Sequence, residues 1–467
     1  MKKISAVVVF FLCSLFSNAQ NMTGSWSGSL ELQNSQLPLI FHIQKKDSIY
    51  KTIMDSPAQG ATGIIVDSTS VQDSLITYVI KNIGATYKGQ LKNDTLIVGT
   101  FTQAGLQFPL DLKKGEIAKE VRKPQEPVPP FPYQNEEVSF TNKNGDTLYG
   151  TLAIPSKNDN MFPAVLLITG SGPQNRNAEL FGHKPFLVIS DYLVRQGIAV
   201  LRFDERGVGA SQGNFGKATT QDFADDLVSA FAYLSERNEI NATQIGLVGH
   251  SEGGLVASMM ASKNNTIHFV VLLATPGIRG DRVLASQTQK ILEKSNIAKA
   301  NIDTILGINR TTYDLILKNE DPELLKDKLR QHLTGSISQL NVLNPKPEHL
   351  STPQYIQMMV EQLASPWFTF FVKFDPKLCL QAIKCPVLVL QGENDTQVLP
   401  DNNLHAIETA FKKGNNKRVE IVRLQRLNHL FQQSQTGLPN EYGMIQETFS
   451  PKALQVLGEW IRKQTYK

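Results

Sequence analysis

The sequence predicts an α/β protein whose main domain is a doubly wound, mostly parallel sheet with a helical cap insertion, preceded by a small all-β domain. Three observations support this prediction. Short strand-like runs fill residues 20–115, apolar strands alternate with amphipathic helical stretches from residue 136 onward, and residues 281–377, between two of those strands, are helical in pattern. Apolar strands that alternate with helices are typical of a parallel sheet covered on both faces.

Composition sets the outer limits of the interpretation. The chain has 467 residues, which is long for a single hydrophobic core, so more than one folding unit is expected. Its net charge of +4 is small and no basic run stands out, which argues against a nucleic-acid partner. No His, Cys and Asp cluster has metal-ligand spacing, and no dinucleotide-binding glycine pattern opens the main domain. We therefore expect neither a metal nor a cofactor.

Residues 1–19 have the pattern of a secretory signal peptide. Lys2 and Lys3 precede the apolar run "ISAVVVFFLCSLF", and the small residues Ser17 and Ala19 follow it. This run is shorter than the roughly 20 residues that a spanning helix needs, so cleavage after Ala19 is favoured over a retained anchor. We expect export to a periplasm or to the outside of the cell, and no integral membrane span in the mature chain.

The mature chain would keep two cysteines, Cys379 and Cys385. Cysteines of an exported protein can pair, but a large domain does not need a disulfide. We therefore interpret them as buried thiols that flank a strand. Their pairing and the oligomeric state of the protein both stay open on sequence grounds.

The first folding unit is expected to be an antiparallel barrel or sandwich at residues 20–115. Runs such as "GSWSGSLELQ" and "LPLIFHIQKK" are short, rich in β-branched or aromatic residues, and separated by Gly, Asn, Asp and Ser. Trp26 is expected to fill the core, and we see no catalytic cluster in this unit. Residues 116–135 contain the proline-rich run "KPQEPVPPFPYQ", which predicts an extended linker.

The main domain is expected at residues 136–467. It begins with a hairpin at 136–155 that turns at Asn144-Gly145. We expect strands within 162–170, 198–207, 245–249, 269–277, 385–393 and 419–425, and helices within 184–196, 223–236 and 255–263. The helical residues 281–377 interrupt this alternation and form the predicted cap. Insertions at the carboxyl ends of the strands lie above the site in such domains.

Ser251 is the first candidate catalytic residue. It lies in the pattern Gly-His-Ser-Glu-Gly, residues 249–253, which arises often by chance. Here, however, an apolar strand precedes it and a helix follows, as a nucleophile on a tight strand-to-helix turn requires. Gly249 and Gly253 would let neighbouring backbone pass closely, and the helix N-terminus favours a developing oxyanion.

A serine nucleophile needs a base, and the base needs an orienting carboxylate. On this kind of sheet the chain order is Ser, then Asp or Glu, then His. Asp395 follows the strand expected within 385–393 and is the candidate acid, with Glu393 and Asp401 as rivals.

His429 follows the last expected strand and is the candidate base. Its rivals are less well placed: His250 adjoins the serine on the turn and cannot easily face its hydroxyl, and His405 lies in a helical stretch. His183 is a third rival.

The oxyanion would need two backbone donors. One is the N–H of Glu252, the residue after the nucleophile, and the other comes from the glycine-rich loop after the strand within 162–170, where Ser171 is the best candidate. The same loop could cradle a phosphate, but no lysine follows at phosphate-loop spacing. In the neighbouring run "RFDERGVGASQG", we interpret Asp204, Glu205 and Arg206 as a structural turn held by an Arg–carboxylate pair.

Taken together, the runs "TGSGPQNRN", "GLVGHSEGG", "VLVLQGENDTQV" and "LNHLFQ" resemble the α/β-hydrolase superfamily, in that order, over residues 136–467. They look most like bacterial secreted carboxylesterases with a helical cap. The resemblance implies Ser251 as nucleophile, Asp395 as orienting acid and His429 as base, with an oxyanion hole at the N–H groups of Ser171 and Glu252. Thr169 departs from the histidine that many members carry before the glycine, which bears on the shape of this loop.

The sequence therefore predicts a secreted serine hydrolase that cleaves a small-molecule carboxylic ester, with acylated sugars and aryl esters as candidate substrates. A serine peptidase or amidase and an acyl thioesterase remain alternatives on the same triad, and a non-catalytic binding protein is the alternative outside enzymes. The aromatic run at residues 365–374, which includes Trp367, is expected to pack the cap onto the sheet rather than to line an acyl pocket.

Overall fold

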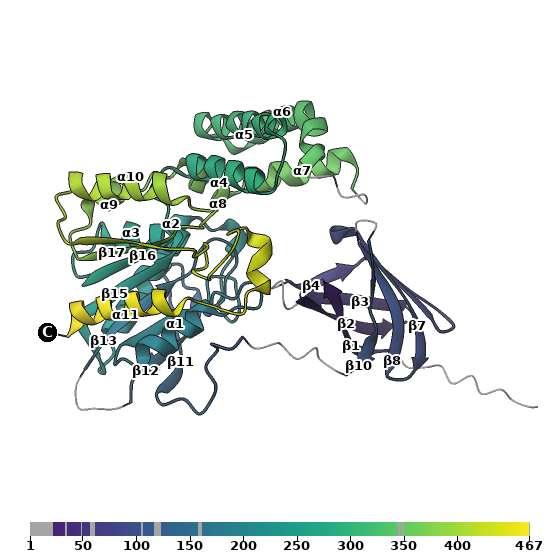
Figure 1. Cartoon of the computed structure of the whole chain (residues 1–467), viewed down its shortest axis with the longest axis horizontal. Coiled ribbons are helices and arrows are strands. Elements are labelled where there is room, and N and C mark those ends of the chain that lie inside the picture. The colour runs from purple at the N-terminus through teal and green to yellow at the C-terminus, as the bar shows by residue number, and fades with distance from the viewer. Residues whose placement is uncertain are drawn as a thin grey trace, which may run out of the picture. The chain divides into compact units, whose positions relative to one another are not determined.

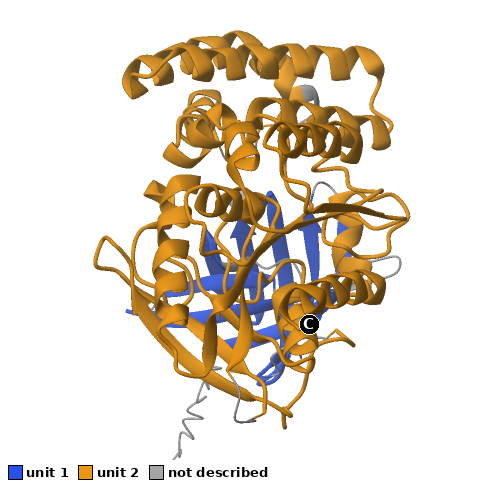
Figure 2. Ribbon diagram, turned by 90° about the vertical axis from the view of Figure 1, so that its left-hand side faces the viewer, with its two compact units in different colours: residues 1–56, 62–119 blue, residues 57–61, 120–467 orange. Residues whose placement is uncertain are grey.

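The computed structural model describes residues 22–32, 35–47, 49–56, 61–103, 106–115, 123–156, 161–343, 346 and 350–466. The chain divides into two compact units, one of residues 1–56 and 62–119 and one of residues 57–61 and 120–467, coloured separately in Figure 2. Each unit has its own hydrophobic core. The signal peptide predicted at residues 1–19 lies outside the described residues.

The first unit is a 10-stranded antiparallel sheet that curls into a near-barrel (Figure 1). Its strand order is β4-β3-β2-β1-β10-β8-β7-β6-β5, with β9 paired to β8. The Thr69 hydroxyl of β5 donates to the Thr52 hydroxyl of β3 at 2.9 Å, which brings the far end of the sheet back to its beginning. The strands are β1 Gly24–Leu32, β2 Ser35–Lys46, β3 Ile49–Ser56, β4 Ala61–Val66, β5 Ser68–Gln72, β6 Leu75–Ile80, β7 Ala85–Asn93, β8 Leu96–Gln103, β9 Leu106–Pro109 and β10 Leu112–Lys114.

Aromatic side chains fill the inside of this near-barrel. Trp26 is fully buried and its indole N–H donates to the carbonyl of Met22 at 2.9 Å, so the prediction of a core tryptophan is confirmed. The Tyr78 ring stacks on Phe41 and on Tyr87, with ring centroids 5.0 and 5.5 Å apart. Such stacked aromatic residues bury large apolar areas, which lets a small unit hold a core of its own.

The second unit is built on an 8-stranded sheet with the order β11-β12-β14-β13-β15-β16-β17-β18. The first two strands are antiparallel and the other six run parallel, as the sequence predicts for a doubly wound sheet. Most of the parallel strands are buried along their whole length because helices cover both faces. The strands are β11 Gln134–Thr141, β12 Thr147–Ile154, β13 Phe162–Ile168, β14 Ala199–Phe203, β15 Ile240–His250, β16 Phe269–Leu273, β17 Val387–Gly392 and β18 Val419–Leu424.

Helices pack on the two faces of this sheet (Figure 1). Helices α1 and α11 share one core with it, and α2, α3 and α10 share the other. Their bounds are α1 Pro185–Val194, α2 Thr220–Ser235, α3 Glu252–Ala261, α10 Pro400–Lys413 and α11 Pro451–Thr465, with short 3-10 helices at η2 Lys81–Ile83 in the first unit and at η3 Phe215–Lys217 and η4 Pro439–Met444 in the second. The predicted fold class is therefore confirmed.

Among the described residues, six helices lie between β16 and β17, where the sequence predicts a cap at residues 281–377. They are α4 Gly280–Lys294, α5 Lys299–Lys318, α6 Pro322–Leu343, α7 Thr352–Leu363, α8 Pro366–Lys373 and α9 Lys377–Ala382. The cap has an apolar cluster of its own, which includes Tyr313, Leu329, Val360 and Val372. The last helix, α9, instead contributes Leu380 to the core that α2, α3 and α10 share with the sheet.

The strand order places one crossing point near the middle of the sheet. From β13 the chain passes through α1 to β14 on one side, and through α2 it then reaches β15 on the other side of β13. The loops that leave β13 and β15 therefore begin side by side at the carboxyl edge. In open α/β sheets this is where ligands bind.

The proline-rich segment is attached to the second unit from Lys123 onward. The Lys123 ammonium donates to the carbonyls of Gly443 and Ile445, both at 2.9 Å, and the Gln125 side chain bonds the backbone of Phe449. The earlier part of the linker predicted at residues 116–135, residues 116–122, lies outside the described residues.

Cys379 and Cys385 are both free and half-buried, at the start and end of the segment that leads into β17. Burial raises the pKa of the Cys385 thiol to about 11, which keeps it protonated and unreactive at neutral pH. In the part of the chain that the structure describes, no helix is both long and apolar enough to cross a bilayer.

Candidate active site

Ser251 sits on a strained turn between β15 and α3. Its backbone has φ 53° and ψ −119°, a conformation that residues with a side chain rarely adopt. The turn is held because the Ser251 N–H donates to the Leu273 carbonyl at 2.8 Å, and the Ser251 carbonyl accepts from Gly254 at 3.0 Å. The result is a half-buried serine side chain presented at the carboxyl edge of the sheet.

The glycines on either side of the serine have the role that the sequence predicts. A Cβ on Gly249 would lie 2.2 Å from the Gly253 carbonyl oxygen, and one on Gly253 would lie 2.2 Å from that of Ile168. Both contacts are with backbone, which cannot move aside easily. The turn at Ser251, here called the elbow, therefore needs glycine at both positions, because α3 packs directly against the ends of β15 and β13.

Asp395 and His429 meet in the loops after β17 and β18. The Oδ2 atom of Asp395 lies 2.8 Å from Nδ1 of His429, and both side chains are almost completely buried. The other carboxylate oxygen accepts from the N–H groups of Gln397 and Val398 at 2.8 and 2.9 Å, while Gln391 also donates to Oδ2. This cage fixes the acid, so the carboxylate orients the imidazole and leaves Nε2 of His429 for other partners.

His250 connects the His429 loop to the elbow. Its Nε2 atom lies 2.8 Å from the backbone carbonyl oxygen of His429, and the two imidazole rings have centroids 4.9 Å apart. Burial and the neighbouring His429 lower the pKa of His250 to about 4, so a neutral His250 donates this bond at neutral pH. His250 is thus a positioning residue rather than the base, and its side chain contacts the His429 loop.

The structure describes both Ser251 and His429 and shows no hydrogen bond between the serine hydroxyl and the imidazole. Such contacts are often loose before substrate binds. The contact of His250 with His429 nevertheless puts the imidazole loop next to the residue that precedes Ser251.

The loop after β13 lies against the serine. A Cβ on Gly170 would be 3.2 Å from Cβ of Ser251, so a side chain here would require the loop or the serine to shift by a few tenths of an ångström. Ser171 follows directly, and Glu252 is the first residue of α3, where the free N–H groups of a helix point outward. Both predicted oxyanion donors therefore lie close to the serine in the structure.

A buried glutamate holds this loop from below. Glu205, which follows β14, accepts from the Thr169 hydroxyl at 2.5 Å and from the Gln174 N–H at 3.1 Å. Burial raises the pKa of Glu205 to about 8. The threonine that departs from the family pattern thus has a local function: its hydroxyl ties the loop to the neighbouring strand.

The turn at residues 204–206 is structural, but its ion pairs differ in detail from the prediction. Asp204 accepts from the Arg176 guanidinium at 3.1 and 2.8 Å, and Arg206 forms a bidentate pair with Asp226 at 2.7 Å. Asp204 therefore pairs with Arg176 in the loop after β13, and Arg206 pairs with Asp226 on α2, so these two residues of the turn do not pair with each other.

The remaining rival residues are either engaged elsewhere or exposed. His183 is buried between the Thr448 hydroxyl and the Tyr442 carbonyl, at 2.9 and 3.0 Å. His405 is exposed on α10, and Glu393 is exposed as well. Asp401 is exposed and pairs with an arginine on β18.

The sequence interpretation missed the role of the Glu252 side chain. This carboxylate is 2% exposed and accepts from the Thr220 hydroxyl at 2.6 Å and from the Trp367 indole N–H at 2.9 and 3.0 Å. Trp367 belongs to the cap, 115 residues away in the chain. A buried acid in the first turn of a helix signals a need for partners, but the sequence does not reveal which donors the fold supplies.

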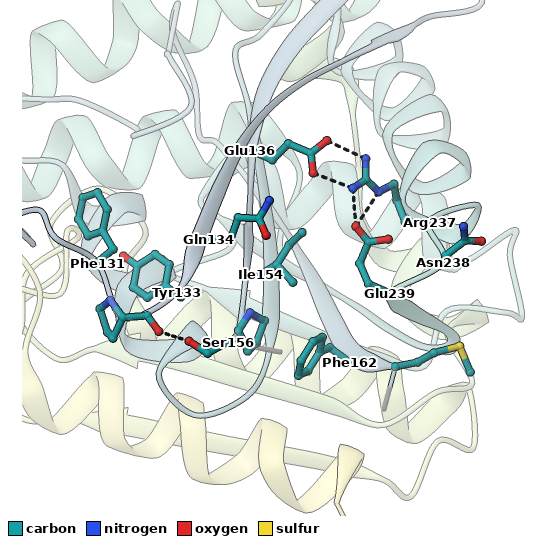
Figure 3. Close-up of a pocket in the computed structure, with 13 residues that line it drawn as sticks. Phe131, Tyr133, Gln134, Glu136, Ile154, Ser156, Phe162, Arg237, Asn238 and Glu239 are labelled. Carbon is teal, nitrogen blue, oxygen red and sulfur yellow. Dashed lines mark hydrogen bonds and ion pairs between the residues drawn. The ribbon is translucent and has the colours of Figure 1, made fainter. Parts of the chain in front are cut away.

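Two large hollows of the second unit lie at the opposite edge of the sheet. One, of about 900 Å³, is lined by Phe131, Tyr133, Glu136, Phe162 and Arg237 among others, at the amino ends of β13 and β15 (Figure 3). Arg237 is paired there with Glu136 and Glu239, as the dashed lines in Figure 3 mark. The other, of about 1020 Å³, lies by the starts of β16 and β17. Neither contains any of the predicted catalytic residues.

Within the described ranges, no group of three or more His, Cys, Asp or Glu side chains is arranged to hold a metal ion. The expectation that the protein needs neither metal nor cofactor remains a prediction.

Comparisons with known proteins identify similar sequences. Residues 186–335 match the profile of the family described as "Serine aminopeptidase, S33". Esterase EstD of Thermotoga maritima is 27% identical over 264 residues, 52% of this chain and 62% of EstD. The uncharacterized protein YfhR of Escherichia coli K12 is 30% identical over 128 residues, 27% of this chain and 41% of YfhR. The chain thus spans less than two thirds of the length of these relatives.

Solved structures include similar chains. The α/β hydrolase GrgF from Penicillium sp. sh18 has a TM-score of 0.45 and 19% identity, covering 72% of this chain and 100% of its own. The Pyrococcus furiosus esterase Pf2001 has a TM-score of 0.43 and 15% identity, covering 71% of this chain and 92% of its own.

Proposed function

Because this chain belongs to the α/β-hydrolase superfamily and resembles its esterases, we propose that it hydrolyses carboxylic esters with Ser251 as nucleophile. The observation that carries the proposal is the buried Asp395–His429 hydrogen bond of 2.8 Å at the sheet edge where Ser251 occupies a strained elbow. A nucleophile, a base and an acid that orients the base are the requirements of acyl transfer.

The proposed reaction has two halves. The Ser251 hydroxyl oxygen attacks the ester carbonyl while Nε2 of His429 takes its proton, and the resulting oxyanion accepts from the N–H groups of Ser171 and Glu252. When the C–O bond breaks, the imidazolium returns that proton to the departing alcohol, and an acyl-serine remains. A water molecule then attacks the acyl carbon while His429 takes its proton, the bond between the acyl carbon and Oγ of Ser251 breaks, Oγ takes the proton back from His429, and the carboxylic acid is released.

The first test is a Ser251→Ala variant assayed on p-nitrophenyl acetate and butyrate. We expect kcat to fall at least about a thousandfold, because the residual catalysis of binding and the oxyanion site is small beside that of a triad. A fluorophosphonate probe should label the wild-type protein and not the variant. Ser262→Ala, at the other end of the same helix, is the matched control and should keep its activity. Unchanged turnover in Ser251→Ala would refute the proposal, and absence of labelling in the wild type would favour a non-catalytic binding protein.

A second candidate reaction is amide hydrolysis on the same triad. The match of residues 186–335 to the family described as "Serine aminopeptidase, S33" favours amide hydrolysis specifically. Aminoacyl p-nitroanilides, assayed beside short acyl esters, acetylated sugars, feruloyl esters and acyl thioesters, separate the alternatives. We propose a small-molecule ester as substrate, so kcat/KM should be highest for a member of the ester group.

We also propose that the protein is exported. The support is the pattern of residues 1–19, with two lysines, an apolar run and a small-residue site. A mature protein that begins at Gln20 would agree with cleavage after Ala19.

A further inference from the structure

The side chain of Glu252 joins three separate parts of the second unit. Its carboxylate accepts from Thr220, the first residue of α2, and from Trp367, on cap helix α8. The hydroxyl of Ser171, on the loop after β13, interacts with the same carboxylate. Glu252 itself immediately follows the predicted nucleophile, so a cap residue and the two predicted oxyanion residues meet at one buried group.

This carboxylate depends on its donors because water does not reach it. Glu252 is 2% exposed and Thr220 is fully buried. Burial raises the pKa of Glu252, whereas the hydrogen bonds from Thr220, Trp367 and Ser171 lower it. A buried acceptor that loses one donor is left with an unsatisfied position, so the four groups are expected to hold one another in place.

The position of this group determines what it can influence. Stabilisation of an oxyanion requires that the backbone donors lie at a fixed separation from the point where the negative charge develops. The two predicted donors are the N–H groups of Ser171 and Glu252, and the side chains of these same two residues interact with each other. A shift of the Glu252 side chain therefore changes the spacing of the donors without altering the nucleophile, the base or the acid.

We propose that Glu252 is a positioning residue whose carboxylate keeps the two oxyanion donors at the correct spacing. The hydrogen bond from the Trp367 indole makes this spacing depend on the position of the cap. The inference rests on the proposed ester hydrolysis. The helical cap then has a role beyond covering the site: a cap displaced from Glu252 leaves the oxyanion donors less well ordered. Closure of the cap over a substrate would accordingly raise kcat as well as affinity.

The test uses Trp367→Phe in the full-length protein, which removes the indole N–H and keeps an aromatic ring that can stack on Phe371. We expect kcat on p-nitrophenyl acetate to fall about tenfold with little change in KM, which is less than the roughly hundredfold or greater loss when an oxyanion donor is removed. Binding of a trifluoromethyl ketone, whose adduct carries an oxyanion, should weaken by the same factor. Trp26→Phe is the matched control, since it deletes an indole hydrogen bond in the other unit.

A double-mutant cycle distinguishes an effect of Trp367 that acts through Glu252 from one in which Trp367 only lines the substrate pocket. In a Glu252→Ala background, Trp367→Phe should have no further effect on kcat, because the acceptor is already gone. Glu252→Gln keeps an acceptor oxygen and should recover part of the kcat lost in Glu252→Ala. If Trp367→Phe changes KM alone, or additively in both backgrounds, the positioning role is wrong. If the wild type lacks Ser251-dependent turnover, the proposed function fails first and this inference fails with it.

Discussion

At the residue scale, Glu205 makes the stability of the folded protein depend on pH. It is a 7% exposed carboxyl group beneath the loop after β13, and burial raises its pKa to about 8. Between the ordinary glutamate pKa and pH 8 the folded protein binds a proton there that the unfolded chain releases. The free energy of unfolding therefore receives a contribution from Glu205 that is present at acidic pH and is lost as the pH rises through 8.

We predict that Glu205→Gln flattens this dependence. Glutamine imitates the protonated acid and can still pair with Thr169 and Gln174, so the variant should match the wild type in stability only at about pH 4, below the ordinary glutamate pKa, and should become the more stable of the two as the pH rises. At pH 9 it should be more stable, by at most a few kcal/mol, since one pKa unit corresponds to about 1.4 kcal/mol. Thermal unfolding at pH 5, 7 and 9 measures the effect. Parallel Tm curves for the two proteins would mean that Glu205 does not titrate in this range.

The individual residues differ in how far the sequence could predict them. Ser251, Asp395 and His429 stand out because the reaction needs three residue types in one order at strand ends, and the structure does bring the acid and the histidine together. The partners of Glu252 could not be predicted in this way. Its link to Trp367 joins residues 115 apart through a cap whose packing no local pattern encodes.

At the element scale, strands and helices were the more predictable part. All six parallel strands were expected from apolar runs, since buried parallel strands carry no polar face. The strand order around β13, with β14 on one side and β15 on the other, could not be predicted from any single run, because it depends on which side of β13 each connection returns to. That order is what brings the loop of Ser171 beside the elbow of Ser251.

The close packing of α3 against β13 gives a prediction at this scale. In Gly253→Ala the new Cβ would lie 2.2 Å from the Ile168 carbonyl and 2.4 Å from that of Thr169, so α3 must move away from the strand. We expect both a lower Tm and a lower kcat, because the helix carries Glu252. Gly307→Ala on cap helix α5 is the control: open space surrounds this glycine, and alanine should stabilise the helix by about 0.5–1 kcal/mol. Equal Tm changes in the two variants would contradict this account of the elbow.

At the scale of the whole molecule, the chain holds two cores that are built on different principles. The first unit closes an antiparallel sheet around stacked aromatic rings, and the second covers a parallel sheet with helices. All predicted catalytic residues lie in the second unit. Composition and strand patterns anticipated both units, but the choice of a near-barrel over a sandwich needed the contact of β5 with β3, which depends on strand curvature rather than on residue type.

Because the two units have separate cores, a cavity made in one core should destabilise that unit and not the other. Trp26→Ala empties a fully buried position in the first unit, and Leu457→Ala does so on α11 in the second. The tryptophan change should destabilise its unit by about 3–5 kcal/mol and the leucine change by about 2–5 kcal/mol. We expect calorimetry to resolve two transitions, with Trp26→Ala lowering one of them and Leu457→Ala the other. Ester hydrolysis measured during heating should be lost with the transition that Leu457→Ala lowers and should be insensitive to Trp26→Ala. A single transition displaced by either variant would mean that the two units unfold as one cooperative body, in which case the first unit would contribute directly to the stability of the catalytic one.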